Sequence, residues 1–252
     1  MAKKKPSDKV VRLLYTLTGG RCYMCNAQVF EEDESGAISY LGHIAHIESS
    51  SEGGPRYAKD LSEEDSNLPD NLMLLCQNCH GLIDNKEKEK EFPTDRVKRI
   101  RKDASDRYSL LLQDHVVNLS YADLSKIGSM LIKKEEEINN LDDSSYSAIS
   151  IQNKIEVNEL SEKTEEKIRW GLMRVNFVKE VLNLNPDIFT IDRLRRVFVR
   201  NYERLRGEGV SGDTLFNELW DHVAGYSLDD SRRAGSLAML AYFFEICEVF
   251  EK

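Results

Sequence analysis

Two pairs of cysteines give the sequence its clearest chemical signal. Cys22 and Cys25 are separated by two residues, and Cys76 and Cys79 repeat that spacing. A turn that brings two thiolates together can occupy one edge of a tetrahedron, so two such pairs suit Zn²⁺. The spacing therefore predicts a structural zinc site. Zinc with four protein ligands stabilises a fold and has no open position for a substrate, so any chemistry must come from other residues.

Imidazole and amide side chains lie between the cysteine pairs and just after them: His43, His46, Asn71 and His80. A neutral imidazole such as that of His46 can take a proton from water near neutral pH. Asn71 could hold the loop that carries this base, or orient the imidazole. His80 and Asp84 are four residues apart, so on a helix they share one face and can bind one divalent cation. His43 is either a second metal ligand or an outward-facing strand residue.

The apolar pattern places these side chains on short elements. The expected order is a helix over Asp8–Leu17, a strand over Ile38–Ile47, a loop over Ser49–Pro69, a strand over Leu72–Leu75 and a short helix from His80. Gly42 weakens the first strand or marks a bulge in it. Strand, loop, strand, cysteine pair and helix form a ββα layout that brings the histidines together.

Residues 20–103 resemble the HNH endonucleases of the ββα-metal class that carry a four-cysteine zinc site, as found in bacterial anti-phage effectors such as CBASS nucleases with a SAVED sensor. The similar stretches are Ile44-Ala45-His46-Ile47, Gly53-Gly54-Pro55-Arg56-Tyr57, Asp70-Asn71, Leu75-Cys76 and Leu82-Ile83-Asp84-Asn85. The resemblance implies that His46 is the general base, that Asn71 supports the base or the metal, and that His80 is a metal ligand. Many HNH enzymes bind metal through the residue just before the base. That residue is Ala45 here, so the missing ligand would come from His43 or Asp84.

A basic helix is expected after Pro93 and could contact DNA phosphates. The residues predicted to bind DNA are Lys98, Arg99 and Lys102 on this helix, together with Arg56 in the preceding loop. The alternative for the helix is an ordinary solvated face, because acidic residues are mixed among the basic ones.

Composition narrows the class of protein. Of the 252 residues, 31% are charged and 40% are hydrophobic, and the net charge is −9. This balance argues against a protein that coats nucleic acid generally, although not against a local basic site. No apolar run is long enough to span a membrane. Cysteines in metal-type pairs fit a reducing compartment, so we expect a cytoplasmic protein.

The second half of the sequence predicts helices alone. They are expected from Ser120 to Ile138 and over Ser161–Asn183, Ile191–Arg206, Asp213–Tyr226 and Ser231–Phe250. The aromatic-rich last helix must bury its apolar face against its own domain or a partner. No catalytic constellation is visible here, which favours a role in assembly.

This half resembles the C-terminal domain of effectors in ABC-three-component (Lamassu-like) defence systems. The similar stretches are Lys154-Ile155-Glu156-Val157-Asn158 and the terminal segment Leu240–Glu251. In such systems an effector nuclease assembles with an ABC ATPase related to SMC or Rad50 proteins and with a small middle subunit.

Together these patterns predict an α+β protein in which a ββα-metal HNH domain with structural zinc (residues 1–115) precedes an all-α assembly domain (residues 116–252). We expect a DNA endonuclease that hydrolyses phosphodiester bonds with Mg²⁺ or Mn²⁺. It would be the effector of an anti-phage system, would bind an ABC/SMC-like ATPase and a small middle subunit, and would form homo-oligomers on activation. Two alternatives stay open: a non-catalytic zinc module that binds DNA, and a degenerate HNH fold that serves as a scaffold.

Overall fold

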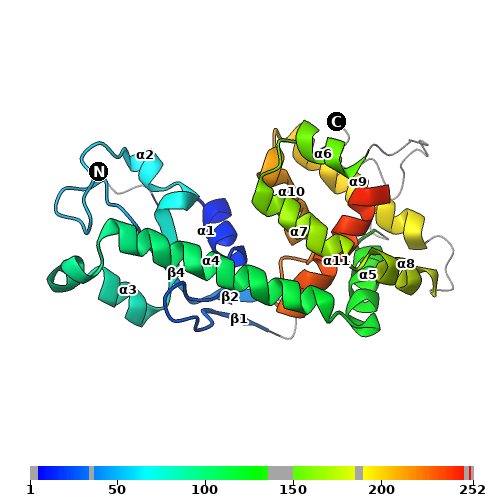
Figure 1. Ribbon diagram of the computed structural model, residues 1–252, viewed down its shortest axis with the longest axis horizontal. Helices are drawn as coiled ribbons and strands as arrows, with labels where there is room; N and C mark the ends of the chain where they lie inside the picture. Colours follow the sequence, from blue (N-terminus) through cyan, green and yellow to red (C-terminus); the bar gives the residue numbers. More distant parts are fainter. Residues whose placement is uncertain (1–4, 34–36, 136–149, 185–189, 247–249, 251–252) are drawn as a thin grey trace. The chain divides into compact units, whose positions relative to one another are not determined.

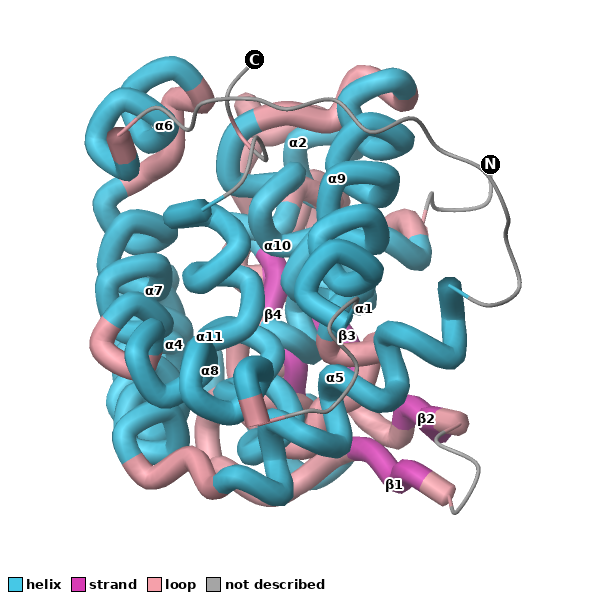
Figure 2. Tube along the Cα trace, turned by 90° about the vertical axis from the view of Figure 1, so that its right-hand side faces the viewer, coloured by secondary structure: helices cyan, strands magenta, loops and turns pink. Residues whose placement is uncertain are grey.

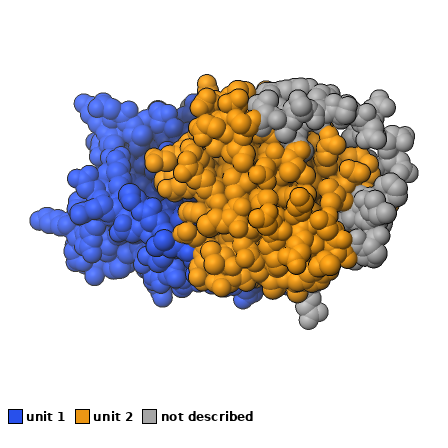
Figure 3. Space-filling view, turned by 45° about the vertical axis from the view of Figure 1, so that its right-hand side comes forward, with its two compact units in different colours: residues 1–111 blue, residues 112–252 orange. Residues whose placement is uncertain are grey.

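The computed structural model describes residues 5–33, 37–135, 150–184, 190–246 and 250. The chain divides into two compact units, residues 1–111 (unit 1) and 112–252 (unit 2), coloured separately in Figure 3. The division falls inside helix α4 (Thr94–Val117). The boundary expected from the sequence, after residue 115, lies in the same helix.

The chain is an α+β protein of mostly helices with two small sheets, and the strands of the described residues all lie in unit 1 (Figure 2). Besides the first part of α4, unit 1 contains, in chain order, α1 (Asp8–Thr16), β1 (Phe30–Glu32), β2 (Ile38–Tyr40), β3 (His43–His46), α2 (Glu63–Ser66), the 3₁₀ turn η1 (Pro69–Asn71), β4 (Leu72–Leu75), α3 (Gln77–Ile83) and the 3₁₀ turn η2 (Lys86–Glu91) (Figure 1).

Both sheets are antiparallel pairs. β1 pairs with β2, and β3 pairs with β4 so that His43 faces Leu75 and His46 faces Leu72. All four residues of β4 are fully buried, and α1 and α3 both pack against this strand. β4 is therefore the core of unit 1, and β3 and α3 are positioned by their contacts with it.

The single strand expected over Ile38–Ile47 is two strands, β2 and β3, separated at Leu41 and Gly42. The backbone N–H of Gly42 donates to the Tyr15 hydroxyl over 2.7 Å. A Cβ at Gly42 would lie 2.4 Å from a methyl carbon of Leu74, so only glycine fits this close approach. The glycine that was expected to weaken the strand in fact divides it.

Unit 2 begins with the end of α4, and its remaining described elements are helices: α5 (Tyr121–Glu135), α6 (Ile151–Val157), α7 (Glu162–Leu172), α8 (Val175–Asn183), α9 (Thr190–Gly207), α10 (Gly212–Val223) and α11 (Asp230–Ile246) (Figure 1). The helix expected over Ser161–Asn183 is thus two helices. The N–H of Arg174 bonds to the carbonyl three residues back, at Gly171, which ends α7 in a tight turn, and α8 begins at the next residue. Gly171 lies near the end of α7, but it stays helical and allows close packing on α11, so it does not indicate the break, and no proline is present there.

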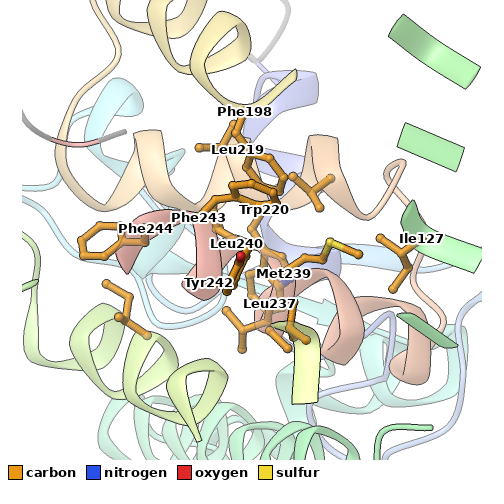
Figure 4. Close-up of a cluster of buried hydrophobic side chains, with 14 of the residues drawn as sticks. Ile127, Phe198, Leu219, Trp220, Leu237, Met239, Leu240, Tyr242, Phe243 and Phe244 are labelled. Carbon is orange, nitrogen blue, oxygen red and sulfur yellow. The ribbon is translucent and has the colours of Figure 1, made fainter. Parts of the chain in front are cut away.

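Helix α11 is the centre of unit 2. Every residue from Arg233 to Phe244 is buried, and α11 packs against α5, α7, α8, α9 and α10. Figure 4 shows its Leu240 and Phe243 among side chains of the neighbouring helices. A helix that is buried on all sides needs no polar stripe, and α11 has none. Its aromatic residues Tyr242, Phe243 and Phe244 are buried within the unit, so they do not form the exposed face that a partner would cover.

Among the described residues, no helix combines the length and apolar character needed to cross a membrane.

Candidate functional site

The four cysteines of the two pairs lie together in unit 1. Their Sγ atoms are all within 4.8 Å of one another, and the Sγ atoms of Cys25 and Cys76 are 3.7 Å apart. Tetrahedral Zn²⁺ with Zn–S bonds of ~2.3 Å places its sulfurs about 3.8 Å apart. Four sulfurs at this spacing, with no carboxylate among them, fit a structural zinc ion.

Each cysteine pair lies on a turn that its own backbone holds. In the first pair, the Asn26 N–H donates to the Cys22 carbonyl, and Asn26 has a left-handed φ of 63°. In the second pair, Cys76 is the N-cap of α3, and the His80 N–H donates to its carbonyl. The helix was expected to begin at His80, but the pair itself forms its first turn, because an N-cap and a residue three positions later naturally converge.

The thiols of Cys22, Cys76 and Cys79 have perturbed acidities. Burial raises the pKa of Cys22, and burial together with a hydrogen bond to Cys76 raises that of Cys79. Burial also acts to raise the pKa of Cys76, but hydrogen bonds from Cys79 and the other thiols outweigh it, so this pKa is lowered. The neighbouring thiols thus favour the thiolate form of Cys76, and a cation bound there would also stabilise the thiolates of Cys22 and Cys79.

A second group of polar side chains lies where α3 packs on β3. The rings of His43 and His80 have centroids 5.3 Å apart, and His80 Nε2 is 3.5 Å from a carboxylate oxygen of Asp84. His43 is exposed, whereas His80 and Asp84 are partly exposed. The three residues proposed as ligands of a catalytic cation are therefore neighbours, and two imidazoles with a carboxylate are a donor set that suits a divalent metal. The position before His46 offers no ligand, because the side chain of Ala45 is a methyl group, and it is buried in β3.

His46, the residue proposed as general base, ends β3 and is partly buried. Its Nε2 lies 3.2 Å from the side-chain oxygen of Asn67. Sequence reasoning did not include Asn67, because its partner is 21 residues away and no motif joins them.

Asn71 acts on the backbone beyond His46. Its side chain accepts from the Glu48 N–H over 3.0 Å and donates to the Glu48 carbonyl and the Ser66 carbonyl, each over 2.9 Å. Of the two roles expected for Asn71, these contacts fit the one in which it holds the loop next to the base.

Arg56 was expected to reach DNA, and the structure corrects this prediction. The residue is 7% exposed, and its guanidinium donates to the carbonyls of Ile47, Ile83 and His46 and to the carboxylate of Asp84. The backbone N–H of Arg56 donates to the carboxylate of Glu89. The bonds of the guanidinium join the end of β3 to the end of α3, so Arg56 positions the site from within.

The basic residues of α4 differ in their surroundings. Lys98 pairs with Glu48 over 3.1 Å, Lys102 pairs with Asp106, and Arg99 is exposed. Arg101 donates to the carbonyls of Leu72 and Pro69 and pairs with Asp70. The helix therefore combines an exposed basic face with an arginine that anchors the start of β4, and Arg101 also lay outside the predicted site.

In unit 2, one polar side chain of α6 and one at its C-cap donate hydrogen bonds to the backbone near the end of the chain. Lys154 is fully buried and donates to the Phe244 carbonyl over 2.7 Å, and Asn158 donates to the Phe250 carbonyl over 2.7 Å. Phe244 lies in the last turn of α11, where a cation is favourable. The two stretches that carry the resemblance in this half are therefore in contact with each other.

Comparison with known proteins identifies unit 2. Residues 122–251 match the family model of C-terminal domain 10 of the ABC-three component (ABC-3C) systems. A search of curated proteins gave no match to the chain.

Proposed function

Because the chain belongs to the ABC-three component family defined by C-terminal domain 10, we propose that it is the effector of such a system and that unit 1 is a metal-dependent DNA endonuclease of the HNH type. The proposal places the chain in anti-phage defence, with DNA as substrate and an ABC/SMC-like ATPase and a small middle subunit as partners. The family match supports the system, and the residues of unit 1 support the chemistry.

One observation carries the nuclease proposal. A single buried guanidinium, that of Arg56, donates to the carbonyl of His46 and to the carboxylate of Asp84, both over 3.1 Å. The strand that bears the proposed base and the helix that bears the proposed metal ligands are thus fixed to each other. Metal-assisted phosphodiester hydrolysis needs these two functions at one phosphate.

The residues have separate roles in this mechanism. His46 takes the proton of the attacking water, and Asn71 holds the loop that follows it. His80, with Asp84 or His43, would hold Mg²⁺ or Mn²⁺, which supplies positive charge to the phosphate oxygens when bound. Arg99 and the neighbouring lysines of α4 would attract the DNA backbone. The expected products carry 5′-phosphate and 3′-hydroxyl ends, as in the HNH enzymes that unit 1 resembles.

The test compares His46→Ala with the wild type on plasmid DNA, in the presence of Mg²⁺ or Mn²⁺ and of the partner subunits. We expect a loss of cleavage of at least ~100-fold with unchanged zinc content, because a general base contributes about 10²–10⁴. His222→Ala, which removes a histidine of unit 2, is the matched control and should cleave normally. Equal cleavage by His46→Ala would refute the role of the base.

A second candidate is a zinc-bound scaffold that binds DNA without cutting it. Ala45 favours it, since that position provides a metal ligand in many HNH enzymes, and so does Asp84, whose carboxylate is already paired with Arg56. This candidate predicts DNA binding that survives His46→Ala, together with no cleavage by the wild type in the assembled system.

A further inference from the structure

We propose that Asn67 is a positioning residue that holds His46 as the Nε2–H tautomer and so makes Nδ1 the atom that accepts the proton. The inference rests on the proposed nuclease function only for the role of the imidazole as general base. The tautomer itself follows from hydrogen bonds within unit 1.

The orientation of the Asn67 amide is fixed by a backbone carbonyl. Its Nδ2 donates to the Glu63 carbonyl over 3.0 Å, one helical turn earlier. An amide turned the other way would place two oxygen acceptors against each other, because neither Oδ1 nor the carbonyl can donate. The side-chain oxygen of Asn67 must therefore face His46.

This orientation decides the protonation of the imidazole. Asn67 Oδ1 lies 3.2 Å from His46 Nε2 and can only accept, so the hydrogen of the contact must sit on Nε2. A neutral imidazole has one N–H, so Nδ1 then carries the free lone pair. A base must present that lone pair to water, and Asn67 selects the nitrogen that does so.

The backbone that carries Asn67 is itself held in place. Ser62 caps α2 by accepting from the Asp65 N–H, and the Asn67 N–H bonds to the Glu64 carbonyl at the end of this helix. Asn71 donates to the carbonyl of Ser66, directly before Asn67, and also to the carbonyl of Glu48. Asn71 thus joins the segment that follows His46 to the segment that carries Asn67.

In the reaction, a water proton moves to Nδ1 while the water oxygen bonds to phosphorus. The bond from phosphorus to the 3′ oxygen breaks, and that oxygen takes a proton from solvent. The imidazolium then returns its proton to solvent. During the transfer Nε2–H keeps its bond to Asn67, so the ring does not have to reorient.

The direct test is nitrogen NMR of the histidine rings in the full-length, zinc-loaded protein without DNA. In the wild type, His46 should show a protonated Nε2 and an unprotonated Nδ1. Asn67→Leu should leave the ring as a mixture of tautomers. Asn67→Asp loses the donor to the Glu63 carbonyl but keeps an accepting oxygen for His46, so it should preserve the Nε2–H form. Asn118→Leu is the matched control, since Asn118 also donates to a carbonyl four residues back but belongs to unit 2.

Activity in the assembled system supplies the second readout. Asn67→Leu should lower kcat by about 10- to 100-fold with little change in KM, and Asn67→Asp should restore most of it. The carboxylate of Asn67→Asp also stabilises the imidazolium, so the acid limb of its rate profile should move to higher pH. A purely structural role would not move this limb.

The outcomes separate the two proposals. A wild-type His46 with its proton on Nδ1, an unchanged tautomer in Asn67→Leu, or full cleavage by that variant overturns the role of Asn67. If the tautomers behave as expected but the wild type never cleaves DNA, the nuclease proposal fails and the assignment of the tautomer stands.

Discussion

At the scale of single residues, Arg56 shows how a buried cation can organise a site without entering its chemistry. Its guanidinium is almost completely buried and has four acceptors on two elements. Lysine has one charged group in place of a planar fork and cannot reach the same acceptors together. We expect Arg56→Lys to destabilise zinc-loaded unit 1 by about 3 kcal/mol, measured by urea unfolding.

The control for this prediction is Arg99→Lys, because Arg99 is exposed on α4. It should change stability by less than ~0.5 kcal/mol. If both lysine variants unfold at the same urea concentration as the wild type, Arg56 does not hold β3 to α3.

Sequence reasoning at this scale succeeded where residues converge through local spacing. Cys22 and Cys25 form one turn, as do Cys76 and Cys79, and their cluster is the metal-type site that the spacing predicted. Contacts between distant residues were missed. Arg56 lies in a loop rich in glycine and polar residues that looks exposed, and the contact of Asn67 with His46 depends on how that loop folds back.

At the scale of elements, the cysteine cluster and the His80 group both include residues of α3 but are expected to have different tasks. Cys76→Ser removes a zinc ligand at the N-cap of α3, so residues 20–90 should unfold, since structural zinc supplies much of the stability of a small domain. His80→Ala changes a partly exposed side chain and should leave a folded, zinc-loaded protein with weak Mg²⁺ or Mn²⁺ dependence. Metal analysis and circular dichroism distinguish the two.

Loss of zinc in both variants, or purified wild type without zinc, would contradict a two-site arrangement.

The pH dependence of zinc binding gives a further check, because zinc must displace protons from the cysteine thiols. Burial raises the pKa of Cys22, so that thiol holds its proton more firmly in the absence of metal. Zinc affinity should therefore fall as pH falls, which a chelator competition can measure.

In unit 2, α6 should stabilise α11 through Lys154. The ammonium group is fully buried and bonds to the Phe244 carbonyl, so Lys154→Met would leave that carbonyl without its donor. We expect a loss of about 2 kcal/mol in the unfolding of unit 2. The exposed Lys163 gives the control, and Lys163→Met should unfold like the wild type. Equal stability of the two variants would show that the contact does not matter.

The elements were predictable to different degrees. Helical periodicity located α9, α10 and α11 to within a few residues, because amphipathic or apolar runs of that length are stable only as helices. It did not locate the break between α7 and α8, because no proline is present there and Gly171 stays within the helical turn of α7. The order β3, β4, α3 agrees with the predicted layout, and the division at Gly42 depends on a tertiary contact with Tyr15 and Leu74.

At the scale of the whole molecule, the core of unit 2 limits which surface can serve assembly. The aromatic residues at the end of the chain were expected to bury their apolar face against their own domain or a partner, and Phe243, Phe244 and Phe250 are fully buried within unit 2. They stabilise the unit and are unavailable to a partner. If unit 2 binds the other components, it must do so through residues outside this core, while the core keeps that surface in shape.

The last prediction concerns the separate roles of the two units in zinc binding and in partner binding. Unit 2 matches the C-terminal domain of ABC-three-component systems, so we expect it to dock the chain onto the ATPase complex. A protein that ends after Val117 keeps α4 complete and retains the four cysteines of the two pairs. It should bind zinc as the full chain does but should no longer co-purify with the partner subunits. Full-length His46→Ala, which leaves unit 2 unchanged, should still co-purify.

The proposed function also gives a reason for joining a nuclease to an assembly unit. One HNH site serves one strand, so a double-strand break needs two sites brought together. A complex that separates the copies until foreign DNA is sensed would restrain cleavage, and their release would allow them to associate. Light scattering on the active system should then show oligomers of the effector. Retained co-purification by the truncated chain, or an effector that stays monomeric and cuts both strands, would refute the assembly role.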